Sequence, residues 1–526
     1  MQYALLFLFI LAIAIANISI MLLYTDKSPV GLQNYPNSFN ICLDVFKRNL
    51  MIDHSPRKSE GEQMEKLEKQ LPNLPLMYML LHNRHFHHKN KTCAKFPTIF
   101  YDMNFNNVHW QKMDTSNGTF YLYGAYLDVR RNNLLGPTVR ILAMINRWKP
   151  TVKSFCQLWF DGTQEPVVSK VLEYIYMFMD VVKRGDRDRA VQPYMLSCQM
   201  PQTHWNKVPV SVSIVEKVCD TASNNLRVIY NKMAEGQQHK KSFAVCVKGL
   251  AFTNEDRSVR LIEWFELLRL VGADKIFLYN LGVHPNISKV LNYYETKGYI
   301  DVRPISLPGG QPNIQPLQQL YLQYVLYNQL FTEMIHYNDC LYRNMYLYDY
   351  IALLDIDEVI LPIAQGNWSV LMEQLHKLDN EGQKKNTASY VFRNVYFLTD
   401  FLEAHRKSGT MAPGLNDIPD YMHMLQHVYR STNHSNPMQY VKCFQNPKEV
   451  AIVHNHHPLV CLGGNCLNYP VDPLVAHLQH YKTHAPSYAK QYANANVIDT
   501  TLWNYKEPLI KATKQVMYDL GFLKTI

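Results

Sequence analysis

The stretch from Tyr350 to Pro362, YIALLDIDEVILP, constrains the fold of this chain more than any other. Its first five residues are apolar without interruption, a pattern typical of a strand that is covered on both faces, as in a parallel sheet. Three acidic residues follow, and Pro362 cannot donate a hydrogen bond to a continuing strand ladder. Side chains two positions apart in a strand point to the same side. Asp355 and Asp357 are therefore expected to project together from the carboxyl end of the strand.

Two carboxylates at this position favour a ligand site. Open α/β sheets bind ligands at the edge where the strands end. Paired carboxylates suit a hard divalent cation such as Mg²⁺ or Mn²⁺, which can also hold a diphosphate. The alternative is a solvated acidic turn after a core strand.

The segment before the acids alternates between strand and helix patterns. Such alternation predicts right-handed βαβ units, a parallel sheet and an α/β fold, with the acids after the fourth strand. Gly272 and Gly298 mark the ends of two helices. The expected strands are 243–248, 275–279, 299–304 and 350–354, and the expected helices are 258–271, 287–297 and 317–335.

Residues 4–23 are apolar except for Asn17 and Ser19, a length that spans a bilayer. We expect an uncleaved signal-anchor with a cytoplasmic tail at 1–3. A cleaved signal peptide is the alternative, because Ala14 and Ala16 resemble a cleavage site. Either reading sends the remainder of the chain to a secretory lumen.

Cysteines and glycosylation sequons agree with that compartment. The chain has 10 cysteines, which are expected to form disulfides there. Cys461 and Cys466 flank a turn and could close a small loop. Five sequons predict N-glycosylation, at Asn90, Asn117, Asn286, Asn367 and Asn433.

Composition divides the chain into three further parts. Residues 24–91 are polar and are predicted to form a stem, with one helix over 60–70. Residues 92–238 contain short strand patterns that predict a β-rich accessory domain, either a carbohydrate-binding module or a structural cover. Residues 239–526 are expected to form the α/β domain. The net charge of +9 is spread out, and no basic-aromatic block indicates nucleic-acid binding.

The acidic motif fits two chemistries. Asp355 to Val359 matches the first motif of haloacid-dehalogenase-type phosphatases, in which the first Asp is a nucleophile. That motif normally opens its domain, however, and here a long α/β segment precedes it. The other reading is a nucleotide-sugar transferase of GT-A type, in which a metal on the two carboxylates neutralises a leaving diphosphate.

Motifs in order along the chain support the second reading, and together they resemble glycosyltransferase family 92. This family includes galactosyltransferases of animals and β-galactan synthases of plants. The matching stretches are AYLDVR at 125–130, FAVCVKG at 243–249, LIEWF at 261–265, GADKIFLYN at 272–280, NDCLYR at 338–343, LLDIDE at 353–358, YVKC at 440–443, VH at 453–454 and HLQHYK at 477–482.

The resemblance implies an inverting, metal-dependent enzyme with a GT-A-type domain, using Mn²⁺ or Mg²⁺. It implies a single-pass type II protein of the Golgi membrane with a lumenal catalytic domain. The enzyme would move a hexose from a UDP-sugar, with UDP-galactose favoured, to a glycan acceptor, for which an N-glycan is one candidate. The alternative is a non-catalytic glycan-binding protein that keeps the fold.

The resemblance also assigns roles to residues. The metal ligands would be Asp355 and Asp357 with His454 or His456. Contacts to the donor would come from Lys248, Tyr279, Asn280, Asp355 and Lys442.

An inverting transfer also needs a general base, which we expect to be Asp420 or Asp417. A helix expected over 421–429 would help to keep either carboxylate ionised. For each of the two, a helix N-cap is the alternative role.

Overall fold

A computed structural model describes residues 59–86, 93–178, 190–324, 326–364, 366–380, 386–486, 492 and 496–524. The chain divides into two units, Met1–Gln63 and Met64–Ile526, and the features below belong to the second. The expected tail at 1–3, the expected anchor at 4–23 and Asn90 lie outside the described residues. Among the helices that are described, none has the length and apolar character needed to cross a bilayer, so the anchor stays a prediction.

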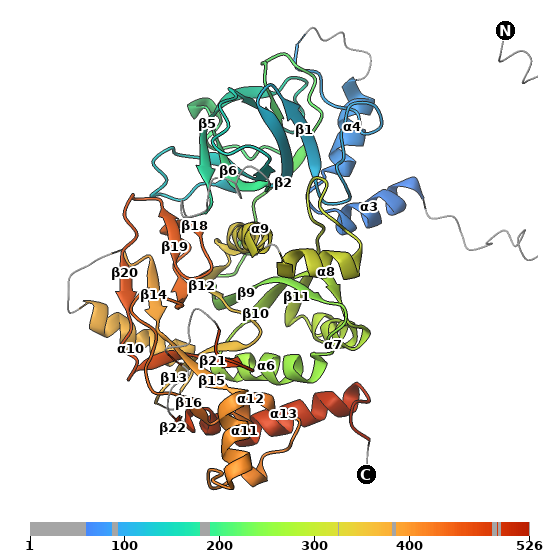
Figure 1. Cartoon of the computed structure of the whole chain (residues 1–526). Helices are drawn as coiled ribbons and strands as arrows, with labels where there is room; N and C mark the ends of the chain where they lie inside the picture. The colour runs from blue at the N-terminus through green and yellow to red at the C-terminus, as the bar shows by residue number, and fades with distance from the viewer. Residues whose placement is uncertain are drawn as a thin grey trace, which may run out of the picture. The chain divides into compact units, whose positions relative to one another are not determined.

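A seven-stranded sheet carries the acidic motif, and its strand order is β11-β10-β9-β12-β17-β14-β20. The four strands β9 to β12 are parallel to one another, which confirms the predicted βαβ arrangement (Figure 1). The other three strands extend the sheet beyond β12, beginning with β17, which is antiparallel. The strands are β9 (Lys241–Phe252), β10 (Lys275–Val283), β11 (Ile300–Pro304), β12 (Tyr348–Leu353), β14 (Ser389–Phe392), β17 (Lys442–Gln445) and β20 (Asn468–Pro470).

The helices of this domain agree with the sequence patterns with one exception. Helix α6 spans Ser258–Val271, as predicted, and ends at Gly272 in the left-handed region. Helix α7 spans Pro285–Thr296. The exception is the helix expected over 317–335: α8 (Gln315–Tyr324) and α9 (Leu326–Asn344) are described on either side of residue 325, and α9 extends nine residues past the expected end.

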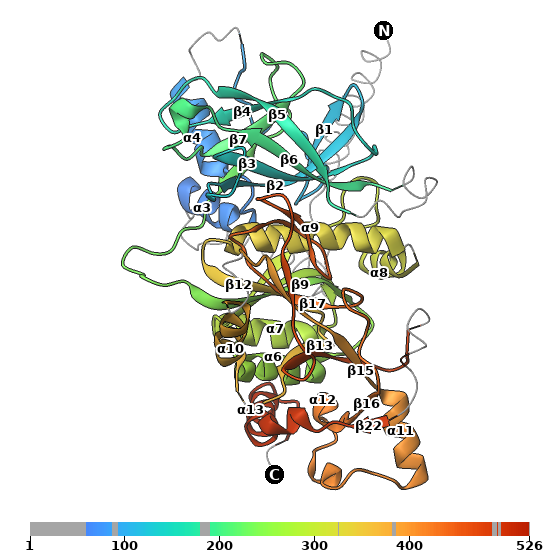
Figure 2. The ribbon, with the colours of Figure 1, turned by 90° about the vertical axis from the view of Figure 1, so that its left-hand side faces the viewer.

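Helix α9 lies between the seven-stranded sheet and a second, β-rich domain (Figures 1 and 2). It packs on β9 and β12 on one side and on β2, β3 and β6 of the β-rich domain on the other. A disulfide between Cys246 of β9 and Cys340 of α9 fixes the helix to the sheet.

The β-rich domain is a sheet that closes on itself. Its order is β1-β2-β3-β6-β5-β4-β7-β8, and β8 pairs back onto β2. All of these pairings are antiparallel except the parallel β2–β8 contact. The strands are β1 (Gln111–Thr115), β2 (Gly118–Asp128), β3 (Thr138–Ile145), β4 (Phe155–Trp159), β5 (Val167–Tyr176), β6 (Gln192–Gln199), β7 (Ser211–Val215) and β8 (Leu226–Ile229).

Part of the expected stem is folded. Helix α3 spans Glu60–Gln70, as predicted, and a second helix, α4, spans Leu76–Phe86. Leu76 and Met79 of α4 are buried in one cluster with Phe96 and Trp159 of the β-rich domain. The expectation of a free polar stem as far as residue 91 is therefore incorrect for α4, because its apolar face packs against the sheet.

Four disulfides are present among the described residues, and each closes within the second unit. They are Cys93–Cys219, Cys156–Cys198, Cys246–Cys340 and Cys461–Cys466. The last one closes the small loop that the sequence suggested. Cys443 is a buried free thiol, and burial raises its pKa to about 12.

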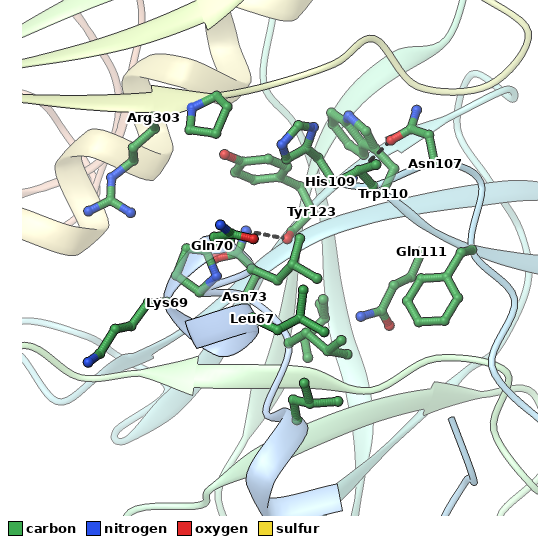
Figure 3. A pocket seen from close by; sticks show the side chains of 18 of the residues that line it. Leu67, Lys69, Gln70, Asn73, Asn107, His109, Trp110, Gln111, Tyr123 and Arg303 are labelled. Atoms are coloured by element: carbon green, nitrogen blue, oxygen red, sulfur yellow. Dashed lines mark hydrogen bonds between the residues drawn. The ribbon is translucent and has the colours of Figure 1, made fainter. Parts of the chain in front are cut away.

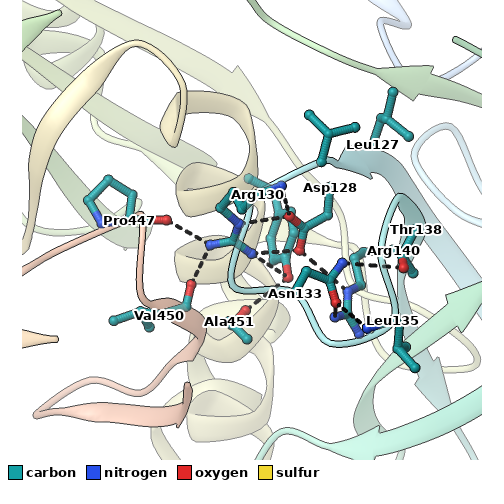
Figure 4. Close-up of polar contacts among 12 residues, drawn as sticks. Leu127, Asp128, Arg130, Asn133, Leu135, Thr138, Arg140, Pro447, Val450 and Ala451 are labelled. Carbon is teal, nitrogen blue, oxygen red and sulfur yellow. Dashed lines mark hydrogen bonds and ion pairs between the residues drawn. The ribbon is translucent and has the colours of Figure 1, made fainter. Parts of the chain in front are cut away.

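A buried ionic network joins the β-rich domain to the α/β domain (Figure 4). The Nε atom of Arg130 donates to Asp128 Oδ1 at 2.8 Å. Its Nη1 donates to the carbonyl oxygens of Pro447 at 2.7 Å and Val450 at 2.6 Å, at the turn between β17 and β18 (Val450–Val453). Burial alone would raise the pKa of Asp128, but Arg130 and Arg140 outweigh it and the pKa is lowered.

We expect Arg130→Met to lower the free energy of unfolding by about 3 kcal/mol, because removing one partner leaves a buried charge poorly compensated. Urea unfolding of the full-length chain would measure the change. Lys69→Met is the matched control, since Lys69 pairs with Glu65 at the surface and its loss should leave the midpoint unchanged. Equal midpoints for the two variants would contradict this account of the domain junction.

Candidate functional site

The acidic motif lies at the carboxyl edge of the parallel sheet, as predicted. Strand β12 ends at Leu353, and four residues separate it from β13 (Glu358–Pro362). The turn between them is closed twice: the Glu358 amide donates to Asp355 O at 3.0 Å, and the Asp355 amide donates to Glu358 Oε2 at 2.9 Å. Both Asp355 and Asp357 line a cavity of about 230 Å³.

Two lysines meet at Asp355. The Nζ atom of Lys248 lies 3.2 Å from Asp355 Oδ1 and 3.2 Å from Glu333 Oε1. The Nζ atom of Lys442 lies 3.5 Å from Asp355 Oδ2 and 3.1 Å from Glu358 Oε2. Burial opposes ionisation of Asp355, but the two ammonium groups outweigh it and lower its pKa. The carboxylate is thus charged throughout the physiological pH range.

Asp357 is held by a strand from much later in the chain. Strand β21 (Ala476–Lys482) pairs antiparallel with β13, so that His480 lies opposite Glu358. His480 Nε2 lies 3.5 Å and Lys482 Nζ 3.4 Å from Asp357 Oδ2. Burial would raise the pKa of Asp357, but His480 and Lys482 lower it.

His480 and Lys482 are site residues that the sequence did not assign. They stand two apart on β21, so they face the same side of the strand. The stretch HLQHYK was recognised as a motif, but pairing of β21 with β13, over 100 residues away, is visible only in the structure.

The opposite wall of the cavity comes from α8 and α9. Residues of these helices face the sheet edge across a space that contains both carboxylates. This wall includes Gln319, Leu322, Gln323, Gln329, Thr332, Glu333 and His336, and the facing wall includes Lys248, Gly249, Leu281, Asp355, Asp357 and Lys482.

Two of the predicted donor contacts, Tyr279 and Asn280, are not among the residues that line this cavity. Tyr279 is 1% exposed, and its hydroxyl donates to the buried carboxylate of Asp339 at 2.6 Å. Its ring stacks on His336, with centroids 4.9 Å apart, and His336 does line the cavity. Tyr279 thus supports a lining residue. Lys442 does not line the cavity either, and it is linked to the site through its contact with Asp355.

The histidines predicted as metal ligands, His454 and His456, also do not line the cavity. They lie in the turn after β18, where His454 packs against Phe178 and His456 Nδ1 lies 3.0 Å from Val441 O. Burial lowers the pKa of His454 to about 3 and that of His456 to about 4. The structure brings His480 to Asp357 instead.

The residues around the motif fit a divalent cation that is shared with a phosphorylated ligand. Mg²⁺ in proteins is commonly held by one or two carboxylates together with substrate phosphates. Asp355 and Asp357 supply two such carboxylates, and both line the cavity. Among the residues described, no group of three His, Cys, Asp or Glu side chains is arranged to hold a metal by itself.

A second cavity, of about 410 Å³, contains Asp420. It is also lined by Asp256, Arg260, His423 and His427. Burial lowers the pKa of His423 to about 2, and the charge of Asp357 opposes this shift. The charge of the acidic motif therefore acts electrostatically on His423. Asp417, at the end of the short helix η2 (Leu415–Asp417), is not among the lining residues.

The helix expected over 421–429 is only one turn, α12 (His423–Gln426). Its first amide groups do not face Asp420. The amides of His423, Met424 and Leu425 donate to the carboxylate of Glu263 on α6, at 2.6 to 3.1 Å. The prediction that this helix end keeps Asp420 or Asp417 ionised is therefore wrong, because Glu263 occupies the position.

A larger cavity, of about 880 Å³, lies elsewhere (Figure 3). It opens between α3, the start of the β-rich domain and the edge strand β11, and it shares no lining residue with the site above. Its wall is mainly apolar, with Leu67, Trp110 and Tyr123 near Asn73 and Arg303. It lacks the two aspartates of the acidic motif, so the smaller cavity is the candidate active site.

Four sequons lie within the described residues. The side chains of Asn367 and Asn433 are exposed, and those of Asn117 and Asn286 are partly exposed. Asn286 Nδ2 donates to Asp256 Oδ2 at 2.6 Å. Modification at these sites stays a prediction.

Comparison with known proteins places the chain in a family. The family model for glycosyltransferase family 92 matches residues 241–513, which is more than half of the 526-residue chain. The chain belongs to glycosyltransferase family 92, as its motifs suggested.

Two individual proteins are similar to parts of the chain. Beta-1,4-galactosyltransferase galt-1 of Caenorhabditis elegans is 23% identical over 295 residues, which cover 54% of this chain and 61% of that protein. The apo structure of the bifunctional glycosyltransferase WbbM is 9% identical over 43% of this chain and 36% of that chain, with a TM-score of 0.17. So low a TM-score does not indicate a shared fold.

We expect Glu263→Gln to change how stability depends on pH. Burial raises the pKa of Glu263 from 4.5 to about 7, against the three amide groups that favour its ionised form. The folded state keeps a proton that the unfolded state loses between these values, so rising pH destabilises the wild type over that window. Glutamine does not titrate. The stability of the wild type relative to the variant should fall by about 3 kcal/mol at most between pH 5 and pH 8.

Urea unfolding of the full-length wild type and variant at the two pH values tests this expectation. Glu403→Gln, at an exposed position of α11 (Thr399–Ser408), is the matched control and should show no such trend. A stability difference that stays constant with pH would show that Glu263 is ionised at both values.

Proposed function

We propose that the chain is an inverting glycosyltransferase that transfers a hexose from a UDP-sugar to a glycan acceptor, with galactose as the favoured sugar. The observation that carries the proposal is the pair Asp355 and Asp357 at the carboxyl edge of the parallel sheet, in a cavity that Lys248 and Lys482 also line. Membership of glycosyltransferase family 92 supports glycosyl transfer. The name of the C. elegans relative, beta-1,4-galactosyltransferase galt-1, supports galactose.

The donor diphosphate would lie against the acidic motif. Lys248 and Lys482 are the cations that face this part of the cavity, and each is paired with an aspartate at 3.2 to 3.4 Å. Asp355 and Asp357 would hold a Mn²⁺ or Mg²⁺ ion together with the diphosphate, and the ion would neutralise the leaving diphosphate as a Lewis acid. His480, whose Nε2 lies 3.5 Å from Asp357 Oδ2, would orient that carboxylate.

The acceptor would enter through the second cavity. In an inverting transfer, a base removes the proton of the acceptor hydroxyl as its oxygen attacks the anomeric carbon and the diphosphate leaves from the opposite face. Asp420 is the carboxylate of the predicted pair that lines this cavity. We therefore favour Asp420 over Asp417 as the base.

The cellular setting belongs to the same proposal. Four disulfides are typical of a protein that folds in an oxidising compartment. The apolar segment 4–23 would anchor the enzyme as a type II protein of the Golgi membrane, with residues 64–526 in the lumen. An N-glycan is a candidate acceptor in that compartment.

A glycan-binding protein without activity is the second candidate function. Such a protein would need a surface that binds carbohydrate but would not need Asp355 and Asp357. The ion pairs of Lys248 and Lys482 with the two aspartates favour the enzyme, because a binding protein has no need for a site balanced for a diphosphate and a metal.

We expect Asp357→Ala to abolish UDP release from UDP-galactose, and a chelator to do the same to the wild type. Removing a residue that stabilises charge in the transition state typically costs about 100-fold or more in kcat. Full-length protein, Mn²⁺ and a panel of UDP-sugars and glycans are sufficient for the assay. Asp349→Ala, on β12 but outside the cavity lining, is the matched control and should stay active.

Full activity of Asp357→Ala would reject the metal–diphosphate mechanism. UDP release from none of the sugars, together with no thermal shift on adding UDP and Mn²⁺, would instead favour the glycan-binding protein.

We expect Asp420→Asn to lower kcat by about 100-fold with little change in the KM for the donor, because proton transfer by a positioned base contributes rate factors of this size. Asp417→Asn is the matched variant and should be close to wild type. The reverse pattern would assign the base to Asp417. Wild-type rates in both variants would place the base on another residue.

A further inference from the structure

The imidazole of His336 is fixed in one orientation at the wall of the candidate active site. It is 1% exposed and stacks on Tyr279 with an interplanar angle of 18°. Its Nδ1 atom accepts the amide hydrogen of Gly249 at 3.0 Å. Position 249 needs a glycine for this approach, because a Cβ atom there would lie 2.6 Å from His336 Cε1.

These contacts also fix the tautomer. A nitrogen that accepts a hydrogen bond carries no proton, so a neutral ring with Nδ1 as acceptor has its hydrogen on Nε2. Burial lowers the pKa of His336 to about 3, which keeps the ring neutral. The Nε2 atom is buried and has no hydrogen-bond partner. His336, which lines the cavity, therefore has a buried N–H donor without a partner.

Gln319 of α8 presents an unused acceptor in the same cavity. It is 7% exposed, and its Oε1 atom is buried without a hydrogen-bond partner. A buried polar atom without a partner is costly, typically by about 1 to 3 kcal/mol. A donor and an acceptor that both lack partners and line one cavity are therefore expected to be satisfied by a ligand.

The place of His336 along α9 relates it to the diphosphate end of the cavity. Glu333 contacts Lys248, which in turn contacts Asp355. His336 is three residues further along, a displacement of about 4.5 Å along the helix axis. A neutral N–H donor one turn away from the charged groups suits the nucleoside part of the donor better than its phosphates.

We propose that His336 and Gln319 read the base of the donor nucleotide and select uracil, with His336 Nε2–H donating to the C4 carbonyl oxygen and Gln319 Oε1 accepting from N3–H. This inference rests on the proposed function. Uracil presents an acceptor and a donor at these two adjacent positions, whereas cytosine presents an amino donor and a ring-nitrogen acceptor. Because the Gly249 amide keeps Nδ1 of His336 as an acceptor, the ring can only donate from Nε2. The pair of His336 and Gln319 therefore matches the hydrogen-bonding pattern of uracil and not that of cytosine.

The test compares the binding of UDP, CDP and 2′-deoxy-UDP to the full-length chain by calorimetry in the presence of Mn²⁺. The variants are His336→Phe, which keeps a ring for stacking on Tyr279, and Gln319→Leu. Each should weaken UDP binding by about tenfold, the size expected for one lost hydrogen bond. CDP binding should change little, so the preference for UDP over CDP should shrink in both variants.

Two matched substitutions on α10 (Trp368–Asn380) control for general effects. His376→Phe and Gln374→Leu change the same residue types at exposed positions and should leave both affinities unchanged. The ratio of the UDP and CDP affinities separates recognition from folding, because a loss of structure would weaken both nucleotides alike.

Three results would overturn the inference alone. They are a wild type that binds UDP and CDP equally, variants that weaken both nucleotides by the same factor, and variants that lose the preference for UDP over 2′-deoxy-UDP instead. The last result would assign the two side chains to the ribose. A wild type that binds no nucleotide would overturn the proposed function as well, and this distinguishes the two failures.

Discussion

The buried carboxylate of Asp339 is the interaction on which the arrangement of the two domains depends. It accepts hydrogen bonds from Tyr126 of the β-rich domain, from Tyr279 of β10 and from Arg343 one turn further along α9. Burial alone would raise its pKa, but Arg343, Arg303 and the two tyrosines outweigh burial and lower it. A buried charge is tolerated only when ionic and hydrogen-bonding partners compensate for its lost hydration. The Asp339 carboxylate therefore holds α9, the parallel sheet and the closed sheet together.

Opposite charges set the state of the active site in a similar way. Asp355 and Asp357 are ionised because Lys248, Lys442, His480 and Lys482 surround them. The three lysines limit how much negative charge the motif presents. Under the proposed function, a donor diphosphate would bring its own negative charge and would compete with the aspartates for these lysines. The freed carboxylates would then be available to a metal ion.

Apolar spacing and glycine positions in the sequence predicted those helices and strands that depend on nearby residues. The bounds of α6 and the parallel pairing of β9 to β12 followed from apolar spacing and glycine stops, and so did the place of Asp355 and Asp357. The short α12 could not be predicted, because the carboxylate that holds its amides belongs to Glu263, over 150 residues earlier. His480 was missed for the same reason, since the pairing of β21 with β13 brings it to Asp357. Contacts over long sequence separations leave no periodic signal.

A continuous set of contacts connects the β-rich domain to the candidate active site. Tyr126 binds Asp339, Asp339 binds Tyr279, and Tyr279 stacks on His336, which lines the cavity. None of these side chains is exposed by more than 1%, so none can reorient without opening the core. If the tyrosine hydroxyls were lost, Asp339 would keep Arg343 but would no longer fix the ring that supports His336. The β-rich domain therefore determines how rigidly one wall of the cavity is held, whether or not it touches a carbohydrate.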